Sequence, residues 1–268
     1  MAFTWIHCGS RRLPECSQIR QMKIHIESFE SISSTNEEAL RQASLGIHEG
    51  FCVVAEEQLE GRGREGRSWH STKGDGLYFS IVLRPRIGPE FLPLITLMSA
   101  VAVYDTIRSL TGAVPDIKWP NDVLVEGKKI AGILAETGYG PERPAVVVGI
   151  GINLTSENLP DEVRANATSL RNICGRAAET SELLKTLTGF LRAGYETLNT
   201  KSDYKRILRE WSARSSFAKD REIIVKLRDE SFEGVTRGLD EYGSLLVEAR
   251  DGRVRKLTAG DIESVRPL

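Results

Sequence analysis

Long hydrophobic runs are absent from this chain. Its 268 residues contain no stretch of 18 consecutive apolar residues, so we expect no helix that spans a membrane. The residues before Met22 also lack the apolar core of a secretory signal. The four cysteines follow no C-x-x-C spacing, which is typical of free thiols in a reducing compartment. These absences predict a cytoplasmic protein with no membrane partner.

A surplus of charge is absent as well. Lys and Arg together number 36 and Asp and Glu 37, whereas a dedicated nucleic-acid-binding protein usually carries a basic face. The P-loop pattern G-x-x-x-x-G-K-[ST] does not occur. Gly61-x-Gly63-x-x-Gly66 has the spacing of the dinucleotide fingerprint, but turn-rich residues follow it and the acidic residue expected about 20 positions later is missing. We therefore expect no DNA binding and no Rossmann-type nucleotide site.

The chain has the composition of a globular protein, with 40% hydrophobic and 27% charged residues. We expect an N-terminal extension over 1–22, a main domain over 23–214 and a small β-barrel over 217–268. Hairpin-linked strands dominate the main domain, which favours an α+β fold whose largely antiparallel sheet is flanked by helices. A doubly wound α/β fold is the alternative.

Periodicity predicts the individual elements. Strands of the main domain are expected over 23–29, 51–55, 77–83, 117–119, 123–125, 129–136 and 145–154. Helices are expected over 37–45, 92–110, 179–198 and 204–211. Short strands of the C-terminal unit are expected over 223–227, 232–239, 244–249 and 254–257.

The run from Gln58 to Trp69 is the most informative stretch. Its interleaved glycines and arginines are Gly61, Arg62, Gly63, Arg64, Gly66 and Arg67. Glycines let a backbone approach a ligand closely, and guanidinium groups match the geometry of carboxylates and phosphates. The run predicts an anion-binding loop, with a solvated surface hairpin as the alternative.

Two downstream segments add polar and charged groups. In the run from Lys118 to Asp122, Asn121 and Asp122 stand side by side and could hold magnesium or nucleotide oxygens; the alternative is an ordinary turn. Lys128 and Lys129 open a strand, so one of them must face inward, where an anion would neutralise it. The alternative there is an edge hairpin protected by its lysines.

Two further segments could admit a ligand or accept its hydrogen bonds. Gly149 and Gly151 leave one face of a buried strand without side chains, either for a ligand or for close helix packing. Ser34-x-x-Glu37 has the pattern of a capping box, and such a helix N-terminus also offers amide donors to a ligand.

Together these segments resemble the biotin–protein ligase family. The run from Gly61 to Trp69 looks like its adenylate-binding loop, and the segments Lys118–Asp122, Lys129–Gly132 and Gly149–Asn153 look like its remaining signatures, in the same order. The resemblance extends from about Ile24 to the C-terminus, where residues from Phe217 are similar to the family's small SH3-like domain. By this resemblance, the main domain is the catalytic ligase domain.

The resemblance implies a reaction in two half-steps. Biotin and ATP give biotinyl-5'-AMP and pyrophosphate, and a lysine of a biotin carboxyl carrier protein then takes the biotin. Lys129 and Arg64 would be the catalytic residues, and Asp122 would bind Mg²⁺. The implied biotin-binding residues are Ser34, Thr35, Gln58, Gly61, Arg62, Arg64, Lys129, Gly132 and Gly149. The implied ATP- and adenylate-binding residues are Arg64, Arg67, Trp69, Lys118, Asn121, Asp122, Lys129 and Asn153.

Several expectations accompany this interpretation. Because ordering a flexible loop costs entropy, we expect the loop to be mobile until the adenylate forms. A homodimer could form through an exposed strand near Ala145 or through the hairpin at Glu126-Gly127. About 22 residues before the first strand are too few for the DNA-binding domain of some family members, which argues against a repressor. A lipoate–protein ligase and a non-catalytic biotin-binding module remain as competing interpretations of the same residues.

Overall fold

The computed structural model describes residues 22–140, 143–176, 179–199, 203–227, 230–258 and 262–267. Nearly all of the expected N-terminal extension therefore lies outside the described residues. Two sheets account for the strands that the structure describes, one of seven strands and one of five. The prediction of an α+β fold with a C-terminal β-unit is confirmed.

The larger sheet has the strand order β1-β2-β3-β7-β6-β5-β4. Its strands are β1 (His25–Ile32), β2 (Phe51–Gln58), β3 (Gly76–Leu83), β4 (Asp116–Lys118), β5 (Asp122–Val125), β6 (Lys128–Gly138) and β7 (Ala145–Asn153). Within this sheet the β1–β2 pair is parallel, and the five remaining neighbouring pairs are antiparallel. β3 and β7 lie at the centre, and their nearly continuous apolar sequences suit strands that are covered on both faces.

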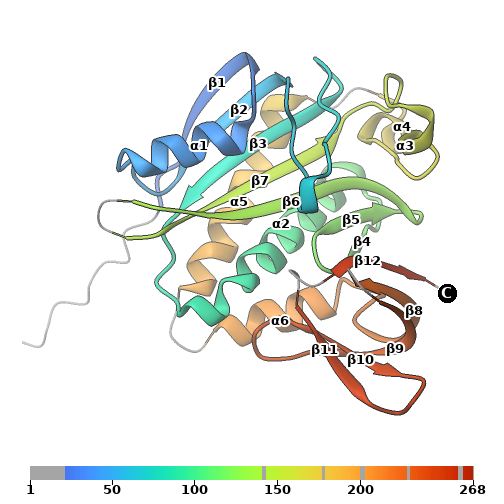
Figure 1. The fold of residues 1–268 in the computed structure, drawn as a ribbon. Coiled ribbons are helices and arrows are strands. Elements are labelled where there is room, and N and C mark those ends of the chain that lie inside the picture. Colours follow the sequence, from blue (N-terminus) through green and yellow to red (C-terminus); the bar gives the residue numbers. More distant parts are fainter. Residues whose placement is uncertain are drawn as a thin grey trace, which may run out of the picture.

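Helices cover the two faces of this sheet unequally (Figure 1). α1 (Thr35–Ser44) lies on one face, where Ala39 and Ala43 pack in a small cluster with Phe51 and Val147. On the other face, α2 (Pro93–Thr111) and α5 (Thr180–Leu198) share the main core with β3 and β6. The N-terminus of α1 is thereby placed directly against the sheet.

α2 is the central helix of the main core. Pro93 occupies its first turn and Gly112, with φ 73°, ends it, as helix termini favour. The segment Pro89–Thr111, which includes the 3₁₀ turn η2 (Pro89–Phe91), is long and apolar enough to cross a membrane. However, 67% of its most apolar window is buried inside the protein, as expected of a core helix.

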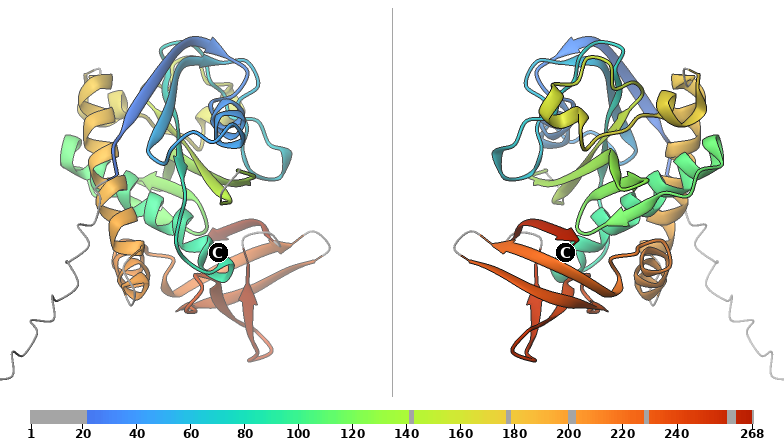
Figure 2. Two further views of the ribbon diagram at one scale, coloured as in Figure 1. Left: turned by 90° about the vertical axis from the view of Figure 1, so that its left-hand side faces the viewer. Right: turned by 90° about the vertical axis from the view of Figure 1, so that its right-hand side faces the viewer.

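The five C-terminal strands form an antiparallel sheet of order β11-β10-β9-β8-β12. They are β8 (Lys219–Leu227), β9 (Ser231–Leu239), β10 (Leu245–Ala249), β11 (Val254–Leu257) and β12 (Ile262–Pro267). This sheet lies at one end of the molecule beside α6 (Tyr204–Ser212) (Figure 2). The Trp119 indole N–H donates to the Gly243 carbonyl at 3.1 Å, so the sheet contacts the segment between β4 and β5.

Two sequence expectations about the fold need correction, and the helices α3 (Asp161–Arg164) and α4 (Leu170–Cys174) and the strand β12 were not predicted. β7 lies between β3 and β6, so the strand near Ala145 is not an exposed edge that could pair subunits. Ser34 is the N-cap of α1, but no side-chain hydrogen bond caps the helix, and the expected capping box does not form. The two short helices were missed because one or two turns leave little periodicity.

Candidate active site

The loop after β2 folds into a small hairpin. The Trp69 amide donates to the Gly61 carbonyl at 2.8 Å, and the Gly63 amide donates to the Arg67 carbonyl at 2.7 Å. The 3₁₀ turn η1 (Arg64–Gly66) closes its tip, where Glu65 has φ 56° and Gly66 has φ 72°. Successive left-handed residues are accessible mainly to glycine and cost other residues energy. The glycines of the loop therefore allow its tight turn to form, in addition to any close approach to a ligand.

Gly61 illustrates this structural use of glycine. A Cβ atom on Gly61 would lie 2.3 Å from the Trp69 carbonyl oxygen and 2.6 Å from the Ser71 hydroxyl. The close approach of the two loop strands explains the glycine without a ligand. Gly61 does not line the pocket, so its expected direct contact with biotin is not supported by its position.

The loop covers a pocket over α1, β6 and β7. Thirteen of the fifteen expected site residues line it, from five separate stretches of the chain. They are Ser34, Thr35, Gln58, Arg62, Arg64, Arg67, Trp69, Lys118, Asn121, Asp122, Lys129, Gly132 and Gly149. The long-range topology thus brings the predicted motifs together around one cavity.

One end of the pocket is formed by neutral polar groups at the start of α1. The Gln58 side-chain oxygen accepts from the Thr35 backbone N–H at 2.8 Å and lies 3.0 Å from the Thr35 hydroxyl. The Gln58 amide nitrogen donates to the Ser71 hydroxyl at 2.9 Å. Ser34 and Thr35 are buried. These fixed groups can recognise a polar ligand group by hydrogen bonds.

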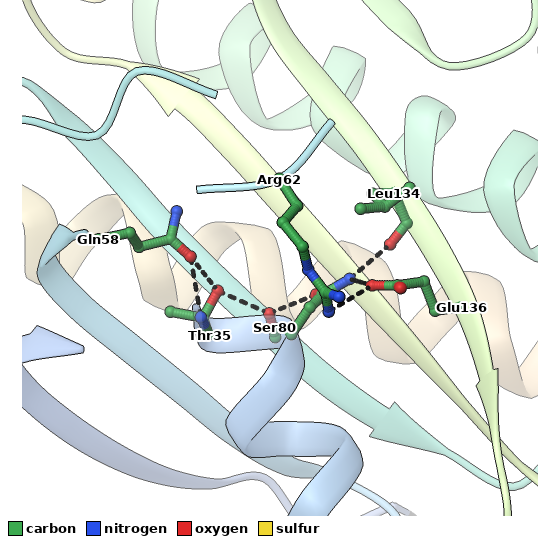
Figure 3. Close-up of polar contacts among 7 residues, drawn as sticks. Thr35, Gln58, Arg62, Ser80, Leu134 and Glu136 are labelled. Carbon is green, nitrogen blue, oxygen red and sulfur yellow. Dashed lines mark hydrogen bonds and ion pairs between the residues drawn. The ribbon is translucent and has the colours of Figure 1, made fainter. Parts of the chain in front are cut away.

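Three residues behind this end were absent from the predicted site. Asn36 donates to the Glu136 carboxylate at 2.7 Å and lies 2.6 Å from the Ser80 hydroxyl. Figure 3 shows Ser80 and Glu136 in the polar network at this end of the pocket. Glu136 also pairs with the Arg62 guanidinium of the loop at 3.2 Å. A lone serine inside the apolar strand β3 was the sequence signal available for Ser80. The Asn36–Glu136 contact spans 100 residues and left no local signal.

The other end of the pocket is charged. The Lys129 ammonium lies 2.6 Å from the Asp122 carboxylate, and Arg64 donates to the Asn121 side chain at 3.3 Å. Burial lowers the pKa of the Arg64 guanidinium, while the nearby carboxylates of Glu65 and Asp122 oppose that shift. Lys128 is exposed and Lys129 lines the pocket, so the prediction that one of the two lysines faces inward is confirmed.

The Trp69 side chain lies between the neutral and the charged end of the pocket. Gly132 and Gly151 are directly paired across β6 and β7. Their missing side chains form a flat surface for the indole, since a Cβ on Gly151 would lie 2.4 Å from the Trp69 ring. The Lys129 ammonium lies 5.2 Å from the centre of that ring, within cation–π range. The gap predicted at Gly151 is therefore filled by Trp69, and the gap at Gly149 is filled by Asn36.

A second, larger cavity adjoins the charged end and extends towards the C-terminal sheet. It shares Arg67, Trp69, Lys118, Asp122 and Lys129 with the first pocket. Its remaining lining includes Asp116, Asn153, Leu159, Phe217 and Arg221. The two cavities therefore meet at a group of cations, where anionic groups of two ligands could be brought together.

Asn153 lies apart from the thirteen expected residues that line the first pocket. It lines the second cavity only, and its amide donates to the Thr168 carbonyl at 3.0 Å and to the Lys129 carbonyl at 3.4 Å. The Lys129 backbone is also bonded to Asn166 and Thr168. Asn153 thus holds the backbone of Lys129 in place, in addition to facing the cavity.

The comparisons with known proteins can be set against this geometry. Residues 28–153 match the model of the Biotin/lipoate A/B protein ligase family, and residues 220–264 match that of the Biotin protein ligase C terminal domain. The chain belongs to the biotin/lipoate protein ligase family and is a ligase enzyme.

Relatives with curated names cover most of the chain. The biotin–[acetyl-CoA-carboxylase] ligase of Paracoccus denitrificans is 35% identical over 82% of this chain and 92% of its own length. The bifunctional ligase/repressor BirA of Bacillus spizizenii is 35% identical over 89% of this chain and 74% of its own length. Among solved structures, the Aquifex aeolicus biotin protein ligase in complex with biotin and ATP aligns with a TM-score of 0.77 and 28% identity. The alignment covers 91% of this chain and 99% of that one.

Proposed function

We propose that this enzyme activates biotin with ATP, giving biotinyl-5'-AMP and pyrophosphate, and transfers the biotin to a lysine of a biotin carboxyl carrier protein. The observation that carries the proposal is the difference between the two ends of the pocket. Hydrogen-bonding groups at Thr35 and Gln58 suit an uncharged polar ring, and the cations Lys129 and Arg64 suit a carboxylate beside a phosphate. The names of the curated relatives and the biotin–ATP complex support it.

In the first half-step the substrate carboxylate attacks the α-phosphate of ATP, and pyrophosphate leaves. Both reactants are anions, so the barrier contains a large electrostatic repulsion. In this proposal Lys129 bridges the carboxylate and the phosphate. Arg67 lies with Lys129 at the junction of the two cavities, and Arg64 lines the first pocket. Fixed charges of this kind stabilise a transition state without reorganisation. No protein nucleophile is needed, because positioning and charge supply the catalysis.

The second half-step is the attack of a carrier lysine on the mixed anhydride, with AMP leaving. The acceptor amine must approach the same junction of the two cavities. Arg64 and Lys129 would hold the adenylate until the amine arrives, since charge-assisted hydrogen bonds are stronger than neutral ones. A biotin carboxyl carrier protein is the acceptor that the relatives' carboxylase-directed names support.

Asp122 fits the role of a magnesium ligand. Mg²⁺ at nucleotide sites is usually held by one or two carboxylates together with substrate phosphates and water. Among the residues that the structure describes, no group of three or more His, Cys, Asp or Glu could hold a metal ion. Asp122 is a carboxylate at the charged end, so the triphosphate would supply the remaining ligands. Bound there, the ion would neutralise phosphate charge.

Biotin-dependent exchange of labelled pyrophosphate into ATP tests the activation step. We expect exchange with biotin and little with lipoate, which is the substrate of the other enzyme type in the family. Exchange with lipoate but not with biotin would show that lipoate, and not biotin, is the substrate. Binding of biotin without any exchange would leave a non-catalytic module and contradict the proposal.

A further inference from the structure

Four oxygen atoms form a continuous line beneath the neutral end of the pocket. In order they belong to the side chains of Asn36, Ser80, Thr35 and Gln58. The three successive distances are 2.6, 2.8 and 3.0 Å, each within hydrogen-bond range. Thr35, Asn36 and Gln58 line the pocket, whereas Ser80 does not line it and is fully buried. The contacts of Ser80 with Thr35 and of Thr35 with Gln58 are drawn in Figure 3.

Both ends of this line are fixed as acceptors. The Asn36 amide nitrogen donates to the Glu136 carboxylate at 2.7 Å and to the Leu134 carbonyl at 3.2 Å. A carbonyl or a carboxylate can only accept, so the Asn36 oxygen must face Ser80. At the other end the Gln58 oxygen already accepts from the Thr35 backbone N–H, and its nitrogen donates to Ser71.

The line is consequently one hydrogen short. Only the hydroxyls of Ser80 and Thr35 carry a proton within it, and each hydroxyl donates once. Three contacts therefore share two protons. The shortest contact, from Ser80 to the Asn36 oxygen at 2.6 Å, commits the Ser80 proton. The Thr35 proton then serves either Ser80 or Gln58, and the other contact joins two lone pairs.

We propose that Ser80, held by Asn36 and Glu136, is a specificity-determining residue that makes the Thr35–Gln58 end of the pocket require an N–H group from the ligand. Ser80 and Glu136 do not line the pocket, so they act as positioning residues. A ligand N–H that faces Thr35 and Gln58 supplies the missing proton, whereas a ligand oxygen adds another lone pair. This inference rests on the proposed function, because the ureido ring of biotin carries two N–H groups and the dithiolane ring of lipoate carries none.

Calorimetric titration with biotin and two analogues tests this inference. In each analogue one ureido N–H is replaced by a ring oxygen, which keeps the shape of the ring. For the native protein we expect one of the two to bind about tenfold more weakly or worse, because an unpaired buried acceptor costs on the order of 1–3 kcal/mol. The quantity of interest is the ratio of the analogue and biotin Kd values.

Two variants should lower this ratio. Ser80→Ala leaves one proton for the single remaining contact between Thr35 and Gln58, so the line is no longer short of a proton. Glu136→Met removes the stronger acceptor that fixes the Asn36 amide, so the amide can turn. We expect the ratio to fall at least threefold in both variants. Ser33→Ala is the matched control, because Ser33 donates to Glu60 outside this line.

The outcomes separate the possible explanations. An unchanged ratio in both folded variants, as judged by circular dichroism, would overturn the inference. So would equal weakening of biotin and both analogues, which is the signature of a merely structural role. If the native protein binds no biotin, the proposed function itself fails. If it binds biotin but tolerates both analogues equally, only the present inference fails.

Discussion

The two ends of the pocket differ in what they use to bind a ligand. At the Thr35–Gln58 end the groups are neutral, largely buried and joined by polar contacts of 2.8 and 3.0 Å. At the Lys129–Asp122 end the groups are charged, and the lysine and aspartate side chains keep 36% and 22% of their surface exposed. Rigid neutral groups suit recognition of a ligand's shape and donors. Charged groups that can exchange partners suit a reaction between anions.

Substitution of Lys129 should have the largest effect, and it tests the different roles of the neutral and charged ends of the pocket. In Lys129→Met we expect the rate of adenylate formation to fall about 10²- to 10³-fold, the typical loss on removing one transition-state contact. The Kd of biotin should change much less, because the neutral end is intact. Rapid-quench measurement of the adenylate separates the two effects. Lys128→Met is the matched control, since Lys128 is exposed and should leave the rate unchanged. If Lys129→Met formed the adenylate at the native rate, the charged end would not have the catalytic role that distinguishes it from the neutral end.

Arg64→Ala should have the next largest effect. Loss of a charge-assisted hydrogen bond costs about 1.5–3 kcal/mol, or roughly 10- to 150-fold in affinity. We expect weaker biotin binding and faster leakage of the adenylate, measured by calorimetry and by release of labelled intermediate. Native affinity together with native retention of the intermediate would show that Arg64 does not contact the ligand.

Thr35→Val should affect the neutral end alone. Removal of one neutral hydrogen bond costs about 0.5–1.5 kcal/mol, so we expect biotin to bind about three- to tenfold more weakly. The KM for ATP should stay within about twofold, because Thr35 does not line the second cavity. Parallel steady-state titrations of the two substrates measure both values. An equal rise in the two KM values would argue that the ends are not independent.

The loop between the ends should show the smallest change. Hydrogen exchange of residues 61–69 is expected to slow when biotin and ATP form the adenylate. The gain should be modest, on the order of tenfold, because the Gly63 and Trp69 amides are already bonded within the loop. Exchange that does not change on adding both substrates would contradict the expectation that the loop becomes ordered when the adenylate forms.

The sequence predicted the elements and most of the site because its signals were local. The alternation around Lys129 indicated an inward lysine, and periodicity located the long helix α2. The tight packing at Gly61 could not be predicted, because a glycine required by backbone packing looks the same in a sequence as one required by a ligand. Asn153 was expected on the nucleotide side. Its bonds to the Lys129 and Thr168 carbonyls left no signal in the sequence, because they depend on the folded chain.

The missed residues were distant in the sequence. Asn36 meets Glu136 across 100 residues and Ser80 across 44, and no spacing rule connects them. The two predicted gaps at Gly149 and Gly151 are filled by Asn36 and Trp69. These contacts also join residues that are distant in the sequence. Sequence patterns thus located the motifs, whereas contacts between motifs required the structure.

The most direct test of the proposed biotin ligase activity is mass spectrometry of a biotin carboxyl carrier domain after incubation with this enzyme, ATP and biotin. The account predicts a mass gain of one biotin on a single lysine of the carrier, dependent on both substrates. A carrier that a known biotin ligase modifies, but that gains no mass with this enzyme, would contradict the account.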